Sequence, residues 1–163
     1  MKETRIGNGY DVHRLVKDRK LMLGCVEVPF EFGLLGHSDA DVLCHAIADA
    51  LLGACGLGDI GVHFPDQDER FSGVSGEFIL KRTLALCRAK GFTVGNIDAV
   101  IIAQLPKLSP FIPLMRQRIA DALETDPERV NIKATTEEKL GFTGSGEGMA
   151  SQAVCLMERE VTE

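Results

Sequence analysis

The sequence predicts an α+β fold in which one mixed or mostly antiparallel β-sheet is covered on one face by helices. Segments rich in β-branched residues alternate along the chain with segments of helical periodicity. Several strand-like segments also follow one another closely enough to pair as hairpins. No repeat, low-complexity tract or linker divides the 163 residues, so 1–163 is expected to form a single domain.

The first third of the chain predicts one strand, one hairpin and one helix. The strand covers residues 5–13, and the hairpin joins 20–23 to 26–28 through a two-residue turn. The helix is expected over 39–54, because its apolar residues recur at helical spacing. These apolar residues are Val42, Leu43, Ala46, Ile47, Ala50, Leu51 and Ala54.

A long loop is predicted over residues 55–73, where glycine, aspartate and proline are frequent. Ser75 follows as the N-cap of a helix that ends at Gly91. The apolar residues assigned to that helix are Phe78, Ile79, Leu84 and Leu86. Because the span 64–75 is acidic and contains glycine, we expect it to close over a substrate.

The second half of the chain predicts three more strands and one helix. The strands cover 96–104, 129–135 and 152–158, and the helix covers 110–124. Ile112, Met115, Ile119 and Leu123 are its inward residues. With helices on one face, the other face of the sheet needs a cover, and a partner subunit is one way to supply it.

The composition is that of an ordinary globular protein, with 45% hydrophobic and 26% charged residues. No apolar run approaches the roughly 20 residues of a membrane span, so no membrane is expected as a partner. The formal charge of −6 and the lack of a basic run argue against nucleic acid as a partner. The N-terminal segment resembles no export or transit signal, which predicts a cytoplasmic location.

The five cysteines are scattered, odd in number and set among apolar residues, with no C-x-x-C pair. This pattern is typical of reduced thiols in the core of a protein from a reducing compartment.

Two segments carry ionisable groups where apolar ones would be expected. In GYDVHR, Asp11 and His13 fall on one face of an extended strand. In the 39–54 helix, Asp41, His45 and Asp49 follow each other at intervals of four. Burying such groups is costly unless they are paired or bind a metal.

Asp11 and His13, together with His45, would form a three-ligand metal site with an open position for water or substrate, as catalytic zinc sites have. Asp49, one turn beyond His45, would then bond the second nitrogen of that imidazole. The residues alone leave an alternative open, namely that His45 is a core histidine with satisfied hydrogen bonds. His63 is assigned no role.

Four long motifs resemble those of 2-C-methyl-D-erythritol 2,4-cyclodiphosphate synthase, an enzyme family of the non-mevalonate isoprenoid pathway. They are IGNGYDVH, GLLGHSDADVLCHAIADALLGACGLGDIGVHFPD, IIAQLPKLSPFIPLMR and NIKATTEEKLGFTGSGEG. The resemblance runs nearly from end to end of the chain.

The resemblance implies that Asp11, His13 and His45 bind zinc, and that Glu138 binds a second divalent cation, Mg²⁺ or Mn²⁺, bridging the substrate diphosphate. It also assigns the residues that contact the substrate. His37 and Ser38 would meet its phosphate and sugar, and Asp59, Gly61 and Asp66 its methylerythritol part. The cytidine pocket would comprise Ala103, Pro106, Lys107, Leu108, Ala134, Thr135 and Thr136, and Phe142 belongs to the same predicted substrate-contacting set.

The implied reaction is cyclisation of 4-diphosphocytidyl-2-C-methyl-D-erythritol 2-phosphate with release of CMP. The hydroxyl of Thr135 or Thr136 would help to polarise the diphosphate, and no protein nucleophile is needed. Family members are homotrimers with their sheets packed around a threefold axis and active sites between subunits. Ser145 departs from the family pattern, which has an arginine there pointing into a cavity on that axis, so no isoprenoid diphosphate site is predicted.

Two other classes of function remain open on the residues alone. A metal-dependent phosphatase could use the same aspartate and histidines with water as the nucleophile, and would release inorganic phosphate. A non-catalytic trimeric binding module could keep zinc for structure only.

Overall fold

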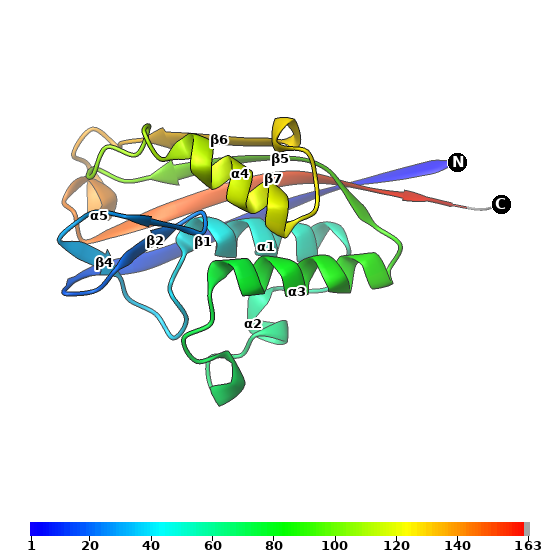
Figure 1. Cartoon of the computed structure of the whole chain (residues 1–163), viewed down its shortest axis with the longest axis horizontal. Coiled ribbons are helices and arrows are strands. Elements are labelled where there is room, and N and C mark those ends of the chain that lie inside the picture. The colour runs from blue at the N-terminus through cyan, green and yellow to red at the C-terminus, as the bar shows by residue number, and fades with distance from the viewer. Residues whose placement is uncertain (162–163) are drawn as a thin grey trace.

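The computed structural model describes residues 1–161, so the last two residues of the expected domain lie outside the described part. Helices and strands alternate along the chain in the order that Figure 1 labels. The strands are β1 (Lys2–Lys17), β2 (Leu21–Leu23), β3 (Val26–Val28), β4 (Phe32–Leu34), β5 (Thr93–Ile102), β6 (Val130–Thr135) and β7 (Gly148–Glu160). The helices are α1 (Val42–Ala54), α2 (Ile60–His63), α3 (Gly76–Ala89), α4 (Ile112–Ala122) and α5 (Gly141–Gly144), with 3₁₀ turns η1 (Glu69–Phe71) and η2 (Pro127–Arg129).

The main sheet has five strands in the order β4-β1-β7-β5-β6, and β2 pairs with β3 in a separate hairpin. β5 and β6 are parallel, whereas the other neighbours in the sheet are antiparallel. The long strands β1 and β7 pair over most of their length, which brings the two ends of the chain together at one end of the molecule (Figure 1). The predicted α+β fold with a mixed sheet is confirmed.

The helices cover the sheet face that carries the odd-numbered residues of β1. Across the sheet, Gly7 lies beside Cys155, Cys155 beside Ile97, and Ile97 beside Val130. The three side chains in this row are almost completely buried. α1 packs on β1 and β7, α4 packs on β6, and α3 lies against α1 and α4. Helices on one face were expected, and the main core lies between them and the sheet.

The opposite face of the sheet keeps apolar side chains in contact with solvent in the single chain. The even-numbered residues of β1 include Ile6, Tyr10 and Val12, which are 72%, 52% and 45% exposed. Val154 on β7 is also exposed.

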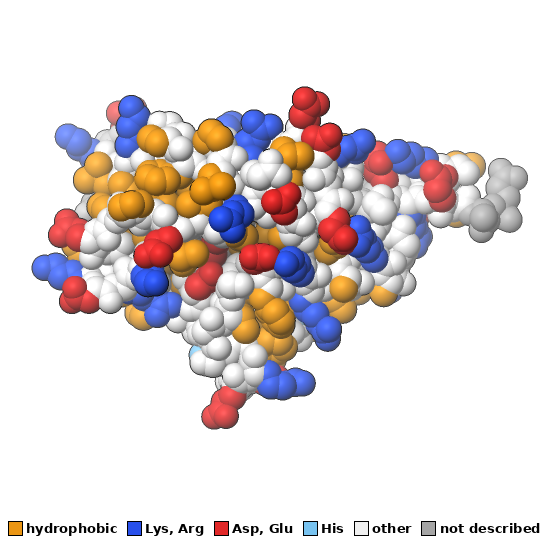
Figure 2. Space-filling view, viewed as in Figure 1, with side chains coloured by type: hydrophobic (Ala, Val, Ile, Leu, Met, Phe, Trp, Pro, Cys, Tyr) orange, Lys and Arg blue, Asp and Glu red, His pale blue; other side chains and the backbone are white. Residues whose placement is uncertain are grey.

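On the face drawn in Figure 2, lysine and arginine side chains are interspersed with aspartate and glutamate, so this view contains no continuous basic surface.

α1 lies unusually close to β1 because glycine occupies two successive inward positions of the strand. A Cβ atom on Gly7 would lie 1.8 Å from the carbonyl oxygen of Ala50, and one on Gly9 would lie 2.0 Å from that of Ala46. Both distances are far below van der Waals contact, so a larger residue would push the helix away. The next inward positions of β1 are Asp11 and His13, and they therefore face the first turn of α1.

Several predicted boundaries are corrected by the structure. The helix predicted over 39–54 begins at Val42, because Asp41 is its N-cap and accepts the backbone N–H of Cys44. The loop predicted over 55–73 contains the short elements α2 and η1, too brief to show periodicity. β5 covers 93–102 rather than the predicted 96–104.

Other differences concern the edges of the sheet. β4 was not predicted, because three residues carry too little alternation to be recognised as a strand. β1 and β7 extend several residues beyond the predicted 5–13 and 152–158, since mutual pairing holds polar terminal residues in strand conformation. Ser75 caps α3 as predicted, with its hydroxyl accepting the N–H of Phe78. Among residues 1–161, no helix has both the length and the apolar character to cross a membrane.

The glycine contact leads to a stability prediction. We expect Gly9→Ala to lower the free energy of unfolding by about 1–3 kcal/mol, the usual cost of overpacking a core. If the predicted set of Asp11, His13 and His45 binds zinc, its affinity should fall as well, because separating α1 from β1 moves His45 away from the two strand residues. Chemical denaturation and zinc competition on the same preparation measure both effects.

Gly53→Ala is the matched control on the same helix. A Cβ at Gly53 would have only the Asn8 carbonyl oxygen near it, at 3.9 Å, so alanine fits. Because glycine destabilises a helix interior, this variant should be about 0.5–1 kcal/mol more stable than the parent. Equal effects from the two substitutions would contradict the close-contact interpretation.

Candidate functional site

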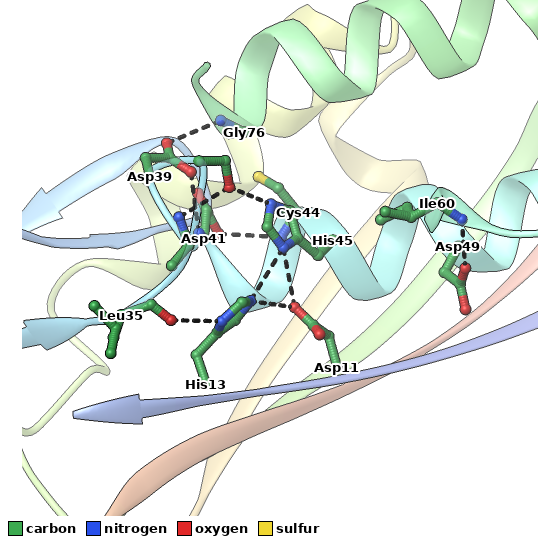
Figure 3. A network of polar contacts seen from close by, with 12 residues as sticks. Asp11, His13, Leu35, Asp39, Asp41, Cys44, His45, Asp49, Ile60 and Gly76 are labelled. Carbon is green, nitrogen blue, oxygen red and sulfur yellow. Dashed lines mark hydrogen bonds and ion pairs between the residues drawn. The ribbon is translucent and has the colours of Figure 1, made fainter. Parts of the chain in front are cut away.

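Asp11, His13 and His45 converge on one point between β1 and the first turn of α1 (Figure 3). The Asp11 Oδ2 atom lies 2.8 Å from His13 Nε2 and 3.0 Å from His45 Nδ1. The two imidazole nitrogens are 3.2 Å apart. The predicted three-residue set is therefore brought together, with one ligand atom from each residue pointing inward.

These separations fit a zinc ion. Zinc bonds of about 2.0–2.1 Å in tetrahedral geometry place neighbouring ligand atoms about 3.3 Å apart. The His13–His45 distance already has nearly this value, and the two distances to Asp11 need to open by only a few tenths of an ångström. One carboxylate and two neutral imidazoles form the kind of donor set that catalytic zinc sites use, leaving one position free.

The outer nitrogen of each histidine is also bonded, to a segment that sequence reasoning did not connect with the metal. His13 Nδ1 lies 2.9 Å from the carbonyl oxygen of Leu35, and His45 Nε2 lies 3.2 Å from Ser38 Oγ. With Nδ1–H of His13 donating to the carbonyl, Nε2 keeps its lone pair for the metal. Ser38 Oγ in turn accepts the N–H of Ala40, which fixes the hydroxyl.

The same contacts shift two pKa values in the metal-free site. Burial alone would raise the pKa of Asp11, but hydrogen bonds from His13 and His45 outweigh it and lower the pKa to about 2. Burial alone would lower the pKa of His13, but the bonded Asp11 carboxylate raises it above the ordinary value. Asp11 thus contributes stability above pH 3.8 that is lost as the pH falls through 2. His13 contributes stability below pH 6.5 that is lost as the pH rises through its raised pKa.

A cavity of about 590 Å³ opens in front of the three ligands. Four residues predicted from the resemblance line it, namely His37, Ser38, Gly61 and Asp66. Its far wall is made by the loop after α2, including Phe64, Gln67 and Phe71. The sequence marked the span that contains these wall residues, but it did not single out which of its side chains would line the cavity. The expectation that 64–75 covers the substrate site is consistent with this position.

Asp49 does not contact His45 as predicted. Its carboxylate accepts the backbone N–H of Ile60 at 3.1 Å, while both ring nitrogens of His45 are bonded elsewhere (Figure 3). Asp49 and Asp59 line a smaller hollow next to the metal ligands. The Asp59 side chain also caps α2 by accepting the N–H of Val62. The prediction for Asp49 was wrong because one turn of helix rotates its side chain past the imidazole.

Asp41, the first residue of the predicted polar row on the helix, has its hydrogen bonds satisfied by the backbone. It is fully buried, and its two oxygens accept N–H groups from Gly24, Cys25 and Cys44 at 2.8–3.0 Å. Its role is to cap α1 and hold the β2–β3 turn against it. Cys25 Sγ lies 3.4 Å from Cys44 Sγ, and all five cysteines are free thiols, as expected.

A second cavity of about 450 Å³ contains all seven residues assigned to the cytidine pocket. It lies between the loop after β5 and the end of β6, and residues 103–109 and 134–136 line it. The seven are Ala103, Pro106, Lys107, Leu108, Ala134, Thr135 and Thr136. The two cavities have no lining residue in common. In one chain, the metal ligands and the predicted nucleotide pocket are therefore separate.

Glu138 and Phe142 lie outside both cavities of the single chain. Glu138 is exposed, has a left-handed backbone with φ of 55°, and its N–H donates to Thr136 Oγ1. Phe142 belongs to α5 and is 38% exposed. The roles predicted for these residues stay predictions. His63 Nε2 bonds the carbonyl oxygen of Leu57, and it does not line the metal cavity.

Comparison with known proteins identifies close relatives. Residues 4–158 match the family described as the YgbB family. A 2-C-methyl-D-erythritol 2,4-cyclodiphosphate synthase of Geobacter sulfurreducens is 61% identical over 156 residues, covering 96% of this chain and 99% of the relative. Two solved structures are similar in fold. The bifunctional IspDF of Campylobacter jejuni has a TM-score of 0.94 and 44% identity, covering 98% of this chain and 43% of that longer protein. The Plasmodium falciparum IspF, solved as a CDP complex, has a TM-score of 0.84 and 32% identity, with 97% of each chain covered.

The raised pKa of His13 predicts how metal binding depends on pH. A histidine must lose its proton to bind zinc, so affinity should rise with pH up to the raised pKa and level off with respect to His13 above it. Competition with a chromophoric chelator between about pH 5.5 and 8.5 measures this dependence. His63→Gln is the control and should leave the profile unchanged. An affinity that does not change with pH would contradict a metal site containing His13.

Proposed function

The chain belongs to the YgbB family, and from this premise we propose that it is a cyclodiphosphate synthase of the non-mevalonate isoprenoid pathway. Its substrate is 4-diphosphocytidyl-2-C-methyl-D-erythritol 2-phosphate. An oxygen of the 2-phosphate attacks the β-phosphorus, the bond from that phosphorus to the oxygen of CMP breaks, and 2-C-methyl-D-erythritol 2,4-cyclodiphosphate forms. The enzyme is thus a phosphorus–oxygen lyase.

The observation that carries the proposal is the convergence of Asp11, His13 and His45 at the mouth of a cavity. The donor set fits Zn²⁺, and Glu138 would hold a second cation, Mg²⁺ or Mn²⁺. Divalent cations supply charge neutralisation to a diphosphate when they are bound. This is how a chain of net charge −6 binds an anionic substrate without a basic groove.

The protein's own groups position the substrate rather than react with it. The attacking phosphate is already anionic, so the remaining requirement is to bend the substrate into attack geometry. Ser38 is fixed by His45 and Ala40 and can direct its hydroxyl toward the phosphate or sugar, with His37 beside it. Asp59, Gly61 and Asp66 would surround the methylerythritol part.

The cytidine group would occupy the second cavity. Backbone N–H and C=O groups around Pro106 and Ala103 offer donors and acceptors to a base edge, in a loop that Pro106 stiffens. Lys107 is exposed there and carries the charge that a phosphate needs. The hydroxyls of Thr135 and Thr136 lie at the end of β6, where they would polarise the diphosphate.

We also propose that the protein is a homotrimer with active sites between subunits. Separate metal and nucleotide cavities in one chain support this, because one substrate must reach both. The apolar residues exposed on the outer face of the sheet give the trimer its buried surface, with the sheets packed around the threefold axis. Residues 1–163 would act as one domain in the cytoplasm, with no membrane or nucleic acid as partner.

CMP release tests the reaction. The protein is treated with a chelator, zinc and magnesium are added back separately and together, and phosphorus NMR identifies the products. We expect metal-dependent CMP and a cyclic diphosphate in equal amounts. His45→Ala should lose zinc and activity while it stays folded. Release of inorganic phosphate would indicate the phosphatase alternative, and a folded, zinc-loaded trimer that releases no CMP would indicate a binding module.

Mixed trimers test where the active sites lie. We expect His45→Ala and Lys107→Glu, which damage opposite sides of the site, to be nearly inactive alone. If each site joins two subunits, every trimer containing both variants has one intact site. Refolding an equal mixture should then restore about a quarter of the wild-type activity, assuming random assembly. No restored activity in trimers verified by light scattering would contradict shared sites.

A further inference from the structure

Arg19 lies just beyond the end of β1 and directs its guanidinium at three backbone carbonyl groups. Its Nε atom donates to the carbonyl oxygen of Leu34. One terminal nitrogen donates to Gly36 at 3.2 Å and to Ser38 at 2.6 Å. The guanidinium thus bonds alternate residues of a single segment, 34–38, which we call the ligand-support segment.

This segment bonds both metal-binding histidines from behind. His13 Nδ1 is hydrogen-bonded to the carbonyl oxygen of Leu35, and His45 Nε2 is hydrogen-bonded to Ser38 Oγ. Gly36 also packs against the His13 ring, since a Cβ there would lie 3.1 Å from its Cε1 atom. Every outer hydrogen bond of the two imidazoles therefore ends on the ligand-support segment.

The segment has little regular structure to hold it. β4 ends at Leu34, and residues 35–40 form neither helix nor strand. Carbonyl groups in such a segment lack a ladder of partners and would otherwise bond mainly to water. The guanidinium supplies several donors in a rigid plane, and one side chain can therefore fix three carbonyl groups at once.

Arg19 is free of competing ion pairs among residues 1–161, so its donors are available for this task. Its backbone is fixed as well. The carbonyl oxygens of Arg19 and Lys20 would lie 2.2 and 2.3 Å from a Cβ on Gly33, which shows how closely the chain passes β4. The side chain is half-buried between the turn and the segment.

We propose that Arg19 is a positioning residue for the metal centre. Through the ligand-support segment it sets the orientation of His13 and His45, and it holds His37 and Ser38 at the cavity. The proposal rests on the proposed function in so far as the histidines bind zinc. Arg19 itself touches neither the metal ligands nor the cavity.

The test compares Arg19→Met, Arg19→Lys and the matched control Arg82→Met. Methionine keeps an apolar stem but removes every donor, and lysine keeps the charge without the planar fork. Arg82 is exposed on α3, so its replacement makes the same chemical change away from the site. Zinc affinity is measured by chelator competition, and the Co²⁺-substituted proteins are compared by their visible spectra.

Loss of an outer hydrogen-bond partner typically weakens metal binding about 10- to 100-fold. Because Arg19→Met displaces these partners rather than removing them, we expect zinc binding to weaken by about tenfold, near the lower end of that range. Its Co²⁺ spectrum should change, and Arg19→Lys should recover part of the affinity. Arg82→Met should match the wild type in both measurements. Wild-type zinc affinity and an unchanged Co²⁺ spectrum in Arg19→Met would overturn the proposal, whatever that variant does to stability.

Amide hydrogen exchange in the metal-free proteins tests the same proposal without a metal. The N–H of Asp39 bonds Val74 and the N–H of Gly73 bonds His37, so both report on the ligand-support segment. We expect both amides to exchange several-fold faster in Arg19→Met than in Arg82→Met, and equal rates would overturn the proposal. If the wild type bound no zinc, the proposed function would fail, and exchange would still decide the role of Arg19.

Discussion

The close contact between β1 and α1 is the constraint on which the rest of the site depends. Gly7 and Gly9 on the strand meet Ala46 and Ala50 on the helix at distances that no side chain larger than hydrogen allows. The helix therefore runs along the strand with its backbone almost touching it. His45, in the first turn of the helix, therefore lies opposite Asp11 and His13, the next two inward residues of the strand. A metal-binding geometry thus follows from a packing rule that involves no metal ligand.

Two buried or partly buried aspartates near the site have different roles, and their hydrogen-bond partners determine the role of each. Asp41 is fully buried, which raises its pKa, and three backbone N–H groups bond its oxygens, so this carboxyl group caps α1. Asp11 receives only the two imidazoles, which lower its pKa to about 2 and leave it ionised for a cation. The difference lies in whether amides or titratable rings face the carboxylate, and burial alone does not account for it.

The single chain divides the proposed chemistry between two cavities. One has charged and aromatic walls and contains the three candidate metal ligands, whereas no aromatic residue among 1–161 lines the other. The diphosphate of the proposed substrate joins a cytidine to a methylerythritol phosphate, and two cavities of different character could bind these two ends. In the proposed trimer, the apolar residues exposed on the outer face of the sheet would be buried between subunits.

The sequence by itself determined much of this protein. Alternation and helical periodicity predicted the mixed sheet and the three longer helices. The Asp-x-His spacing with His45 suggested a metal site, although the residues alone left a core histidine as the alternative. Only through resemblance did the sequence place residues 103, 106–108 and 134–136 in one pocket, because no residue pattern marks them as neighbours. Local pattern failed at β4, α2 and the ends of β1 and β7, where pairing rather than composition sets the structure.

Only the tertiary structure decided the contacts that depend on the direction of a side chain around its helix or on the close approach of distant segments. The spacing of Asp49 from His45 suggested a bond, but the turn of the helix gives that carboxylate to Ile60 and leaves the imidazole to Ser38. The roles of Gly9 and Arg19 were also invisible, since a missing Cβ or a long side chain acquires its meaning from what lies opposite. Periodicity records which face a residue occupies, whereas the partner on that face is set by packing between distant segments.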